Sequence, residues 1–119
     1  MTILVPCSVA DLADRVTILD IKLERITDKD KIKNVRRERE ALKAVWYELN
    51  PTRLTKQMGR LRAVNERIWE LEDSARDPRG IKDPIYLLKS ITTANDERAR
   101  IKREINTLTK SEFVEEKSH

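Results

Sequence analysis

Four stretches of this sequence carry aliphatic residues at alternating steps of three and four positions, which is the spacing of one face of an α-helix. The stretches run from residue 8 to a break at 28–30, from about 30 to 49, from about 51 to 75, and from 83 to about 110. Ser8 and Asp83 provide N-capping side chains at the start of the first and the last stretch. The sequence therefore predicts four amphipathic helices.

Short connections between these helices predict antiparallel neighbours. The second helix ends at Asn50, and Asn50 or Thr52 can cap the third helix with Pro51 in its first turn. The chain has 119 residues, enough for one domain, and its low aromatic content of 4% and its two glycines favour long helices over sheets. The predicted fold is all-α, an antiparallel four-helix bundle made of two helical hairpins, in a single domain over residues 1–119.

The two ends of the chain lie outside the predicted helices. Residues 2–5 form a short extended segment that ends at Pro6, and Phe113 and Val114 begin a tail that ends in charged residues. Phe113 and Val114 dock beside Ile3, Leu4 and Val5, for example as a two-stranded pairing of the termini, or the tail stays undocked. The sequence leaves both alternatives open.

The first helix is apolar on two sides. One stripe contains Leu12, Val16 and Leu19, while Ile18 and Ile21 lie on nearly the opposite side. A helix that needs cover on two sides is central in its fold or is shared with a second subunit. We therefore expect a homo-oligomer, a dimer formed through the Ile18 and Ile21 face.

Polar residues occupy several positions where the helical spacing calls for a buried aliphatic side chain. A buried polar group without a partner costs roughly 1–3 kcal/mol, so these residues should converge and bind one another. When the helices alternate in direction, Asn65 lies opposite Asn95, and Arg98 can pair with Glu38, with Asp14 or Asp20 as alternative partners. The expected polar layer consists of Glu38, Asn65, Glu72, Asn95, Arg98 and Lys102.

This layer has two interpretations. In the first, it fixes the register of the helices, as single polar residues do in coiled coils, and the protein is a structural or interaction module. In the second, it lines a pocket for a ligand that bears a phosphate or a carboxylate, held by Asn65, Asn95, Arg98 and Lys102. Trp46 and Trp69 lie on inward faces and are assigned to the core in both.

Two charged stripes follow the third helix. Arg53, Lys56, Arg60 and Arg67 form a basic edge that could contact the phosphates of a polyanion. The chain has no helix-turn-helix signature, and glutamates interrupt the edge, so the sequence argues against a nucleic-acid partner. The acidic stripe of Glu66, Glu70, Asp73 and Asp77 is read as a solvated face, and we predict no metal site.

Ordinary enzyme chemistry has few candidates here. The only histidine is His119, the only cysteine is Cys7, and no glycine-rich phosphate loop is present. We therefore assign no catalytic residue and no cofactor, and we expect a binding protein rather than an enzyme. No apolar run approaches the roughly 20 residues that span a membrane, and residues 1–5 lack the features of a signal peptide, so we expect a cytoplasmic protein without a membrane partner.

Short motifs extend over nearly the whole chain. They are Val5-Pro6-Cys7-Ser8, Asp14-Arg15-Val16-Thr17-Ile18-Leu19, Ile21-Lys22, Arg25-Ile26, Asn65, Trp69, Glu72-Asp73, Asn95-Asp96-Glu97-Arg98, Lys102, Ile105-Asn106 and Glu115-Glu116-Lys117-Ser118. With these motifs the chain resembles a family of small uncharacterised proteins from bacteria and their phages, classed as a domain of unknown function. It departs from the family at Ala10-Asp11, where members usually have Gly-Glu, and at His119, where they have Tyr. The resemblance implies no known reaction, but it implies that the termini and the polar residues of the first, third and fourth helices meet in space.

Overall fold

A computed structural model describes residues 1–77, 79 and 83–110 of the chain. These residues form four α-helices, α1 (Val9–Arg25), α2 (Lys29–Leu49), α3 (Thr55–Arg76) and α4 (Pro84–Thr109). None of the described residues lies in a strand, so the prediction of an all-α fold is confirmed. The tail from residue 111 onward, and with it the choice between a docked and an undocked tail, lies outside the described residues.

Side-chain caps begin three of the four helices, and the two predicted caps, Ser8 and Asp83, are among them. The Ser8 Oγ accepts a hydrogen bond from the Asp11 N–H at 3.0 Å at the start of α1. Asp28 caps α2 in the same way, and Asp83 caps α4 by accepting from the Tyr86 N–H. These caps satisfy backbone donors that have no partner within the helix, and they fix where each helix starts.

The start of α3 differs from the prediction. Neither Asn50 nor Thr52 caps this helix, which begins only at Thr55. Asn50 and Arg53 both adopt left-handed backbone conformations, with φ of 46° and 64°. The left-handed conformation at Asn50 ends α2. The left-handed conformation at Arg53 interrupts the helical backbone, so α3 begins after Arg53 and not at Pro51.

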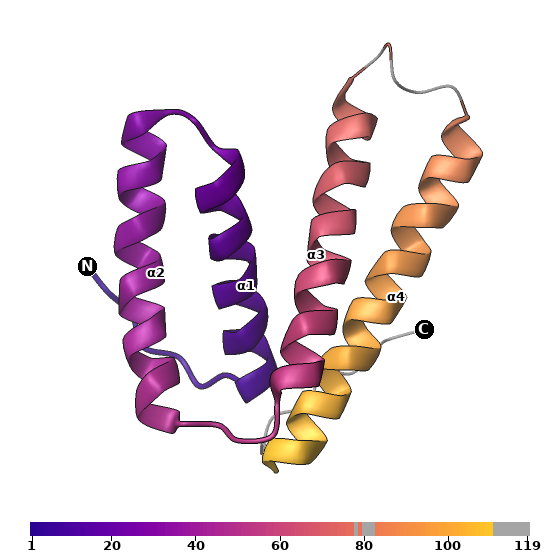
Figure 1. Cartoon of the computed structure of the whole chain (residues 1–119). Coiled ribbons are helices and arrows are strands. Elements are labelled where there is room, and N and C mark those ends of the chain that lie inside the picture. The colour runs from indigo at the N-terminus through magenta and orange to yellow at the C-terminus, as the bar shows by residue number, and fades with distance from the viewer. Residues whose placement is uncertain (78, 80–82, 111–119) are drawn as a thin grey trace.

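The helices alternate in direction, as expected, and form two antiparallel hairpins (Figure 1). α1 packs against α2, and α3 packs against α4. The hairpins meet where α1 contacts both α3 and α4, whereas α2 contacts neither of these helices. The arrangement is a four-helix bundle that is open on one side, with α1 as its central helix.

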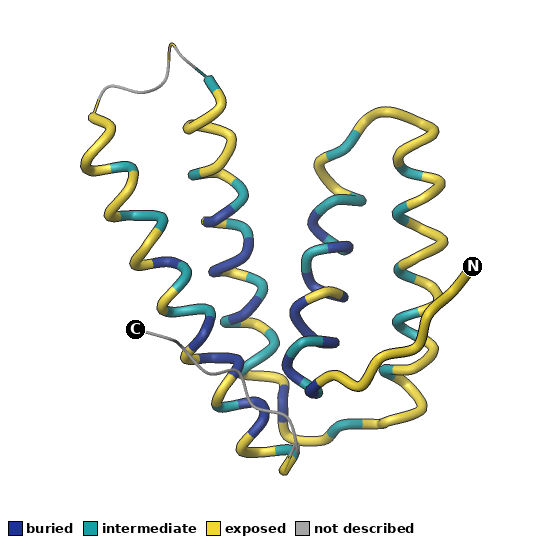
Figure 2. Tube along the Cα trace, turned by 180° about the vertical axis from the view of Figure 1, so that it is seen from behind, coloured by how far each residue is buried: buried dark blue, intermediate teal, exposed yellow. Residues whose placement is uncertain are grey.

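The core lies where α1, α3 and α4 meet. Figure 2 shows buried residues on these three helices and none on α2, in agreement with the absence of a buried side chain among Lys29–Leu49. Ala10 and Ala13 of α1 are fully buried and belong to the same cluster as Leu61, Ile101 and Ile105. Because alanine side chains are small, α1 can approach the α3–α4 hairpin closely along this face.

The second apolar face of α1 is covered largely by the chain itself. Ile21 is only 1% exposed, and Ile18 is half-buried. Both line a cleft whose other walls come from α3 and α4. The prediction of a dimer interface on the Ile18 and Ile21 face is therefore wrong. Within the same chain, α3 covers this face, which the sequence analysis had assigned to a second subunit.

We predict that Leu61→Ala lowers the free energy of unfolding by about 2–5 kcal/mol, because Leu61 is fully buried and its removal leaves a cavity. The same substitution at Leu88, which is 66% exposed on α4, should change it by less than about 0.5 kcal/mol. Urea denaturation followed by circular dichroism measures both. Equal losses for the two variants would contradict this assignment of the core.

Candidate functional site

The first turn of α1 is held by a side chain from the far end of the sequence. The Asn106 Oδ1 on α4 accepts a hydrogen bond from the Ala10 N–H at 3.0 Å, and Asn106 is buried. Ser8 satisfies the next backbone donor, the Asp11 N–H. The start of α1 is therefore capped twice, once by its own N-cap and once by α4, which fixes α1 against that helix.

A buried ionic network extends from this point into the centre of the bundle. The Lys102 Nζ of α4 lies 2.9 Å from the Asp11 Oδ1 and 3.9 Å from the Asp14 Oδ2, both on α1. The Asn65 Nδ2 of α3 donates to the other oxygen of Asp14, at 2.9 Å. Asp14, Asn65 and Lys102 are all buried, so three helices exchange polar contacts away from water. We call Asp11, Asp14, Asn65, Lys102 and Asn106 the polar network.

The network places Asp11 under opposing influences. Burial by itself raises the pKa of the Asp11 carboxyl, but the Lys102 ammonium and the Ser8 cap outweigh burial. The pKa consequently lies below its ordinary value of 3.8. Asp11 is thus held as a carboxylate at the point where α1 and α4 meet, next to the positive end of the α1 dipole.

Two of the predicted layer residues, Asn65 and Lys102, lie in the polar network. Asn95 and Arg98 are half-buried on α4, and Glu72 is exposed on α3. Arg98 and Glu72 line the adjacent cleft together with Asn65. The expected layer is therefore split between a buried network and the wall of a cleft.

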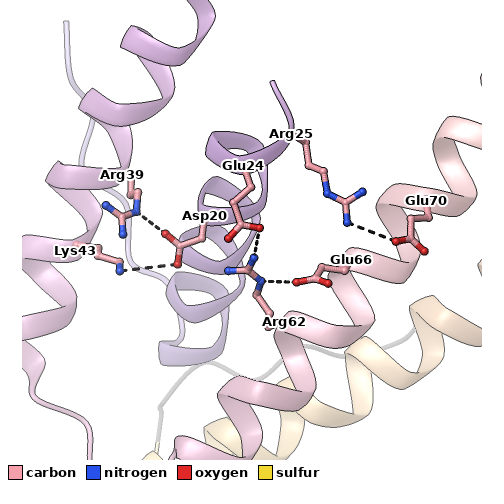
Figure 3. A network of polar contacts seen from close by, with 8 residues as sticks. All are labelled: Asp20, Glu24, Arg25, Arg39, Lys43, Arg62, Glu66 and Glu70. Atoms are coloured by element: carbon pink, nitrogen blue, oxygen red, sulfur yellow. Dashed lines mark hydrogen bonds and ion pairs between the residues drawn. The ribbon is translucent and has the colours of Figure 1, made fainter. Parts of the chain in front are cut away.

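Glu38 is not part of this site. It is exposed on α2, and its Oε1 lies 2.7 Å from the NH2 nitrogen of Arg15 on α1. The expected pairing of Arg98 with Glu38 is wrong, because α2 does not contact α4. Of the alternative partners, Asp14 binds Lys102 and Asn65, and Asp20 binds Arg39 and Lys43 on α2 (Figure 3).

Sequence reasoning missed Asn106 and Asp11 as members of the network. Asn106 follows Lys102 by four residues and so lies on the same inward face of α4, which is the signal that identified Asn65 on α3. Asp11 lies in the first turn of α1, but nothing local in the sequence shows that a lysine 91 positions later reaches it.

Ion pairs also connect α1 to α3 further along both helices. Arg62 of α3 binds Glu24 of α1 and Glu66 of its own helix, and Arg25 of α1 binds Glu70 at 3.4 Å (Figure 3). The hydrogen bond with Glu24, and after it that with Glu66, raises the pKa of the Arg62 guanidinium. The acidic stripe on α3 is therefore partly engaged by arginines rather than wholly solvated.

The expected basic edge does not form a continuous surface. Arg60 is paired with Glu104 at 2.7 Å and with Glu97 at 3.4 Å, and the contact with Glu104 raises the pKa of its guanidinium. Arg53 precedes α3 in the connection from α2, so it does not share a helix edge with Lys56 and Arg67. Lys56 and Arg67 are exposed.

A cleft of about 300 Å³ lies beside the polar network, between α1, α3 and α4. Its apolar wall consists of Ile18 and Ile21 from α1 and Ile68 and Trp69 from α3. Trp69 is only half-buried and lines the cleft, so its assignment to the core needs correction. Charged side chains surround this apolar wall; they are Lys22, Glu72, Asp73, Arg76 and Arg98.

Within the described residues, no cluster of three histidine, cysteine or acidic side chains has the geometry of a metal site. None of the four described helices is long and apolar enough to cross a membrane. The fold and the polar network define a small all-α protein in which one central helix is locked onto a helical hairpin.

The chain belongs to a family of unknown function, DUF6165, whose model matches residues 3–119. This confirms the resemblance to an uncharacterised family and the prediction of a small helical protein to which no activity is assigned. Comparisons with curated proteins and with solved structures give no match.

We predict that Asp14→Leu and Asn65→Leu each lower the free energy of unfolding by about 1–3 kcal/mol, because each leaves a buried polar group without its partner. The double variant should lose at least about 0.5 kcal/mol less than the sum of the two. The exposed pair Arg15 and Glu38 provides a control cycle with a coupling below about 1 kcal/mol. Additive losses at Asp14 and Asn65 would contradict a shared network.

A pH series tests the ion pair of Asp11. Because its pKa is lowered in the folded chain, its stabilising effect is complete above the ordinary carboxyl pKa and is lost as the pH falls through the lowered value. Asp11 is partly exposed, so Asp11→Asn should cost less than about 1 kcal/mol at pH 7. The difference from the wild type should shrink between about pH 5 and pH 2. The control Glu40→Gln, on an exposed residue of α2, should show no such convergence.

Proposed function

We propose that this chain is a protein interaction module that works as a homodimer, in which a second copy covers the open side of α2. The observation that supports this proposal is that α2 is poorly buried. Among the other helices, only α1 lies alongside this helix of 21 residues, and no residue of α2 is buried; its half-buried Trp46 packs against the core. A helix with an apolar stripe normally buries that stripe, so α2 lacks part of its cover.

The uncovered surface of α2 is apolar near its end. Val45 is 47% exposed and Leu49 is 51% exposed, and the two lie one helical turn apart. Leu42, in the preceding turn, is half-buried. Contiguous apolar residues at the surface of a small protein favour an interface with another protein.

The charges along α2 favour a second copy in antiparallel orientation. The first half of the helix, residues 29–37, contains five lysines and arginines and one aspartate, while residues 38–49 contain three glutamates. The two basic residues of the second half, Arg39 and Lys43, are already paired with Asp20. Glu38 is paired with Arg15, so the carboxylates that this half offers to a second copy are those of Glu40 and Glu48. A two-fold axis across the middle of α2 would bring the basic half of each copy beside the acidic half of the other.

In this proposal the polar network acts on register rather than on chemistry. It holds α1 at one position on the α3–α4 hairpin, and α2 depends on α1 for its placement because it contacts no other helix. A network of buried polar groups disfavours sliding by one turn, since sliding would leave each group without its partner. The surface of α2 is thereby presented in one orientation.

Sedimentation velocity tests the proposed dimer. The wild type should show a mass that rises with concentration in the micromolar range, and Val45→Arg should weaken the association at least about tenfold, because it places a charge in an apolar interface. The control Leu88→Arg introduces the same side chain on an exposed position of α4 and should leave association unchanged. A monomeric wild type at all concentrations, or equal effects of the two variants, would contradict the proposal.

Other functions have less support. Polyanion binding along α3 has less support because Arg60 is already paired with Glu97 and Glu104. Cytoplasmic location and an origin in a bacterium or phage stay predictions from the sequence. We assign no catalytic residue to the chain.

A further inference from the structure

We propose that the cleft between α1, α3 and α4 binds a small amphipathic anion, a molecule with an apolar body and one carboxylate or phosphate group. No residue of α2 lines this cleft, so the proposal goes beyond the dimer and does not depend on it. The volume of about 300 Å³ is at the lower end of what ligand pockets in proteins enclose.

Two cationic side chains of the cleft differ from the other partly buried cations in their pairing. Among the described residues, seven lysines and arginines are at least half-buried: Lys22, Arg39, Lys43, Arg60, Arg62, Arg98 and Lys102. Five of these take part in ion pairs. Lys22 and Arg98 have no ion pair within the described part of the chain, and both line the cleft. A partly desolvated cation gains more from an anionic partner than an exposed one does, so these two charges favour an anion between them.

An apolar surface lies beside these cations. Ile18, Ile21 and Ile68 line the cleft together with the half-buried ring of Trp69. Ile21 and Ile68 are only 1% and 6% exposed, so the apolar surface that is open to water belongs to Ile18 and Trp69. An aromatic or aliphatic body that covers these two side chains would release water from them, and the ring of Trp69 can stack against a planar group. A bare inorganic anion would leave this surface wet and is therefore not the expected ligand.

The acidic residues of the cleft do not cancel its positive charge. Glu72 and Asp73 line the cleft but are exposed, as is the third cation, Arg76. Water and salt screen exposed charges strongly, whereas Lys22 and Arg98 are half-buried and are screened less. The field inside the cleft is set by the two half-buried cations.

Asn65 also lines the cleft. Its Nδ2 is engaged by Asp14, but its Oδ1 is buried and has no hydrogen-bond partner within the described part of the chain. The oxygen is buried, so contact with a ligand in the cleft would require the cleft wall to shift. A ligand that carries a hydroxyl or amine donor would satisfy an acceptor that is otherwise costly to bury.

The experiment uses matched probes on the full-length chain by isothermal titration calorimetry. Indole-3-lactate has the planar body, a hydroxyl donor and a carboxylate, whereas indole-3-ethanol lacks the carboxylate. Pyridoxine 5′-phosphate and pyridoxine form the corresponding phosphate pair. We expect at least one anionic probe to bind with a dissociation constant below about 1 mM and at least about fivefold more tightly than its neutral partner. The probe that binds tells carboxylate from phosphate as the source of the anion.

The variant Arg98→Gln locates the binding site. It should weaken the anionic probe at least about fivefold without unfolding the chain, because no ion pair holds Arg98 in the described structure. Arg100→Gln makes the same change two residues away, at an exposed arginine that is paired with Glu97 outside the cleft, and should leave affinity unchanged. Failure of both anionic probes to bind, equal binding of charged and neutral probes, or equal effects of the two variants would overturn the proposal.

The role of Asn65 is tested from the side of the ligand, because substitution of Asn65 would also disturb the polar network. Indole-3-propionate is indole-3-lactate without the hydroxyl group. We expect it to bind at least about threefold more weakly to the wild type, since the Asn65 Oδ1 then stays without a partner. Equal affinities of the two carboxylates would overturn the assignment of Asn65 as the acceptor.

Discussion

The contact on which the rest of this structure depends is that of the Asp14 carboxylate with Asn65 and Lys102. It joins α1, α3 and α4 at one buried point, with distances of 2.9 Å to Asn65 and 3.9 Å to Lys102. Charges buried in this way are costly unless every partner is in place, so the contact disfavours any other alignment of the three helices. Asp11 and Asn106 extend it to the first turn of α1, where the helix is capped from α4.

The shape of the molecule follows from this anchoring. Ala10 and Ala13 permit close packing of the first half of α1 beside the network, whereas its second half is joined to α3 by the long side chains of Glu24, Arg25, Arg62 and Glu70. Long charged side chains hold helices further apart than alanines do. The cleft lies along this second half, and α2 is left with α1 as its only neighbour.

The two proposals concern different surfaces and make separate demands on the sequence. The dimer needs the uncovered surface of α2, whose first half is mainly basic and whose second half contains three glutamates and the exposed Val45 and Leu49. Anion binding needs partly buried cations without ion pairs; among the described residues Lys22 and Arg98 meet that condition, while Arg60 and Arg62 do not. α1 belongs to both, because it carries α2 on one side and supplies Ile18, Ile21 and Lys22 to the cleft.

The sequence by itself determined the helices and identified Asn65 and Lys102 as misplaced polar residues, because apolar spacing, caps and helix propensity act within a few residues of one another. It could not determine which polar groups bind each other. Glu38 was paired with Arg98, and Ile21 was assigned to a second subunit, because helical spacing fixes the face of a residue but not the helix that covers that face. Only the tertiary structure decided that α3 covers Ile21 and that Lys102 reaches Asp11, since these contacts depend on the lateral order and the rotation of whole helices.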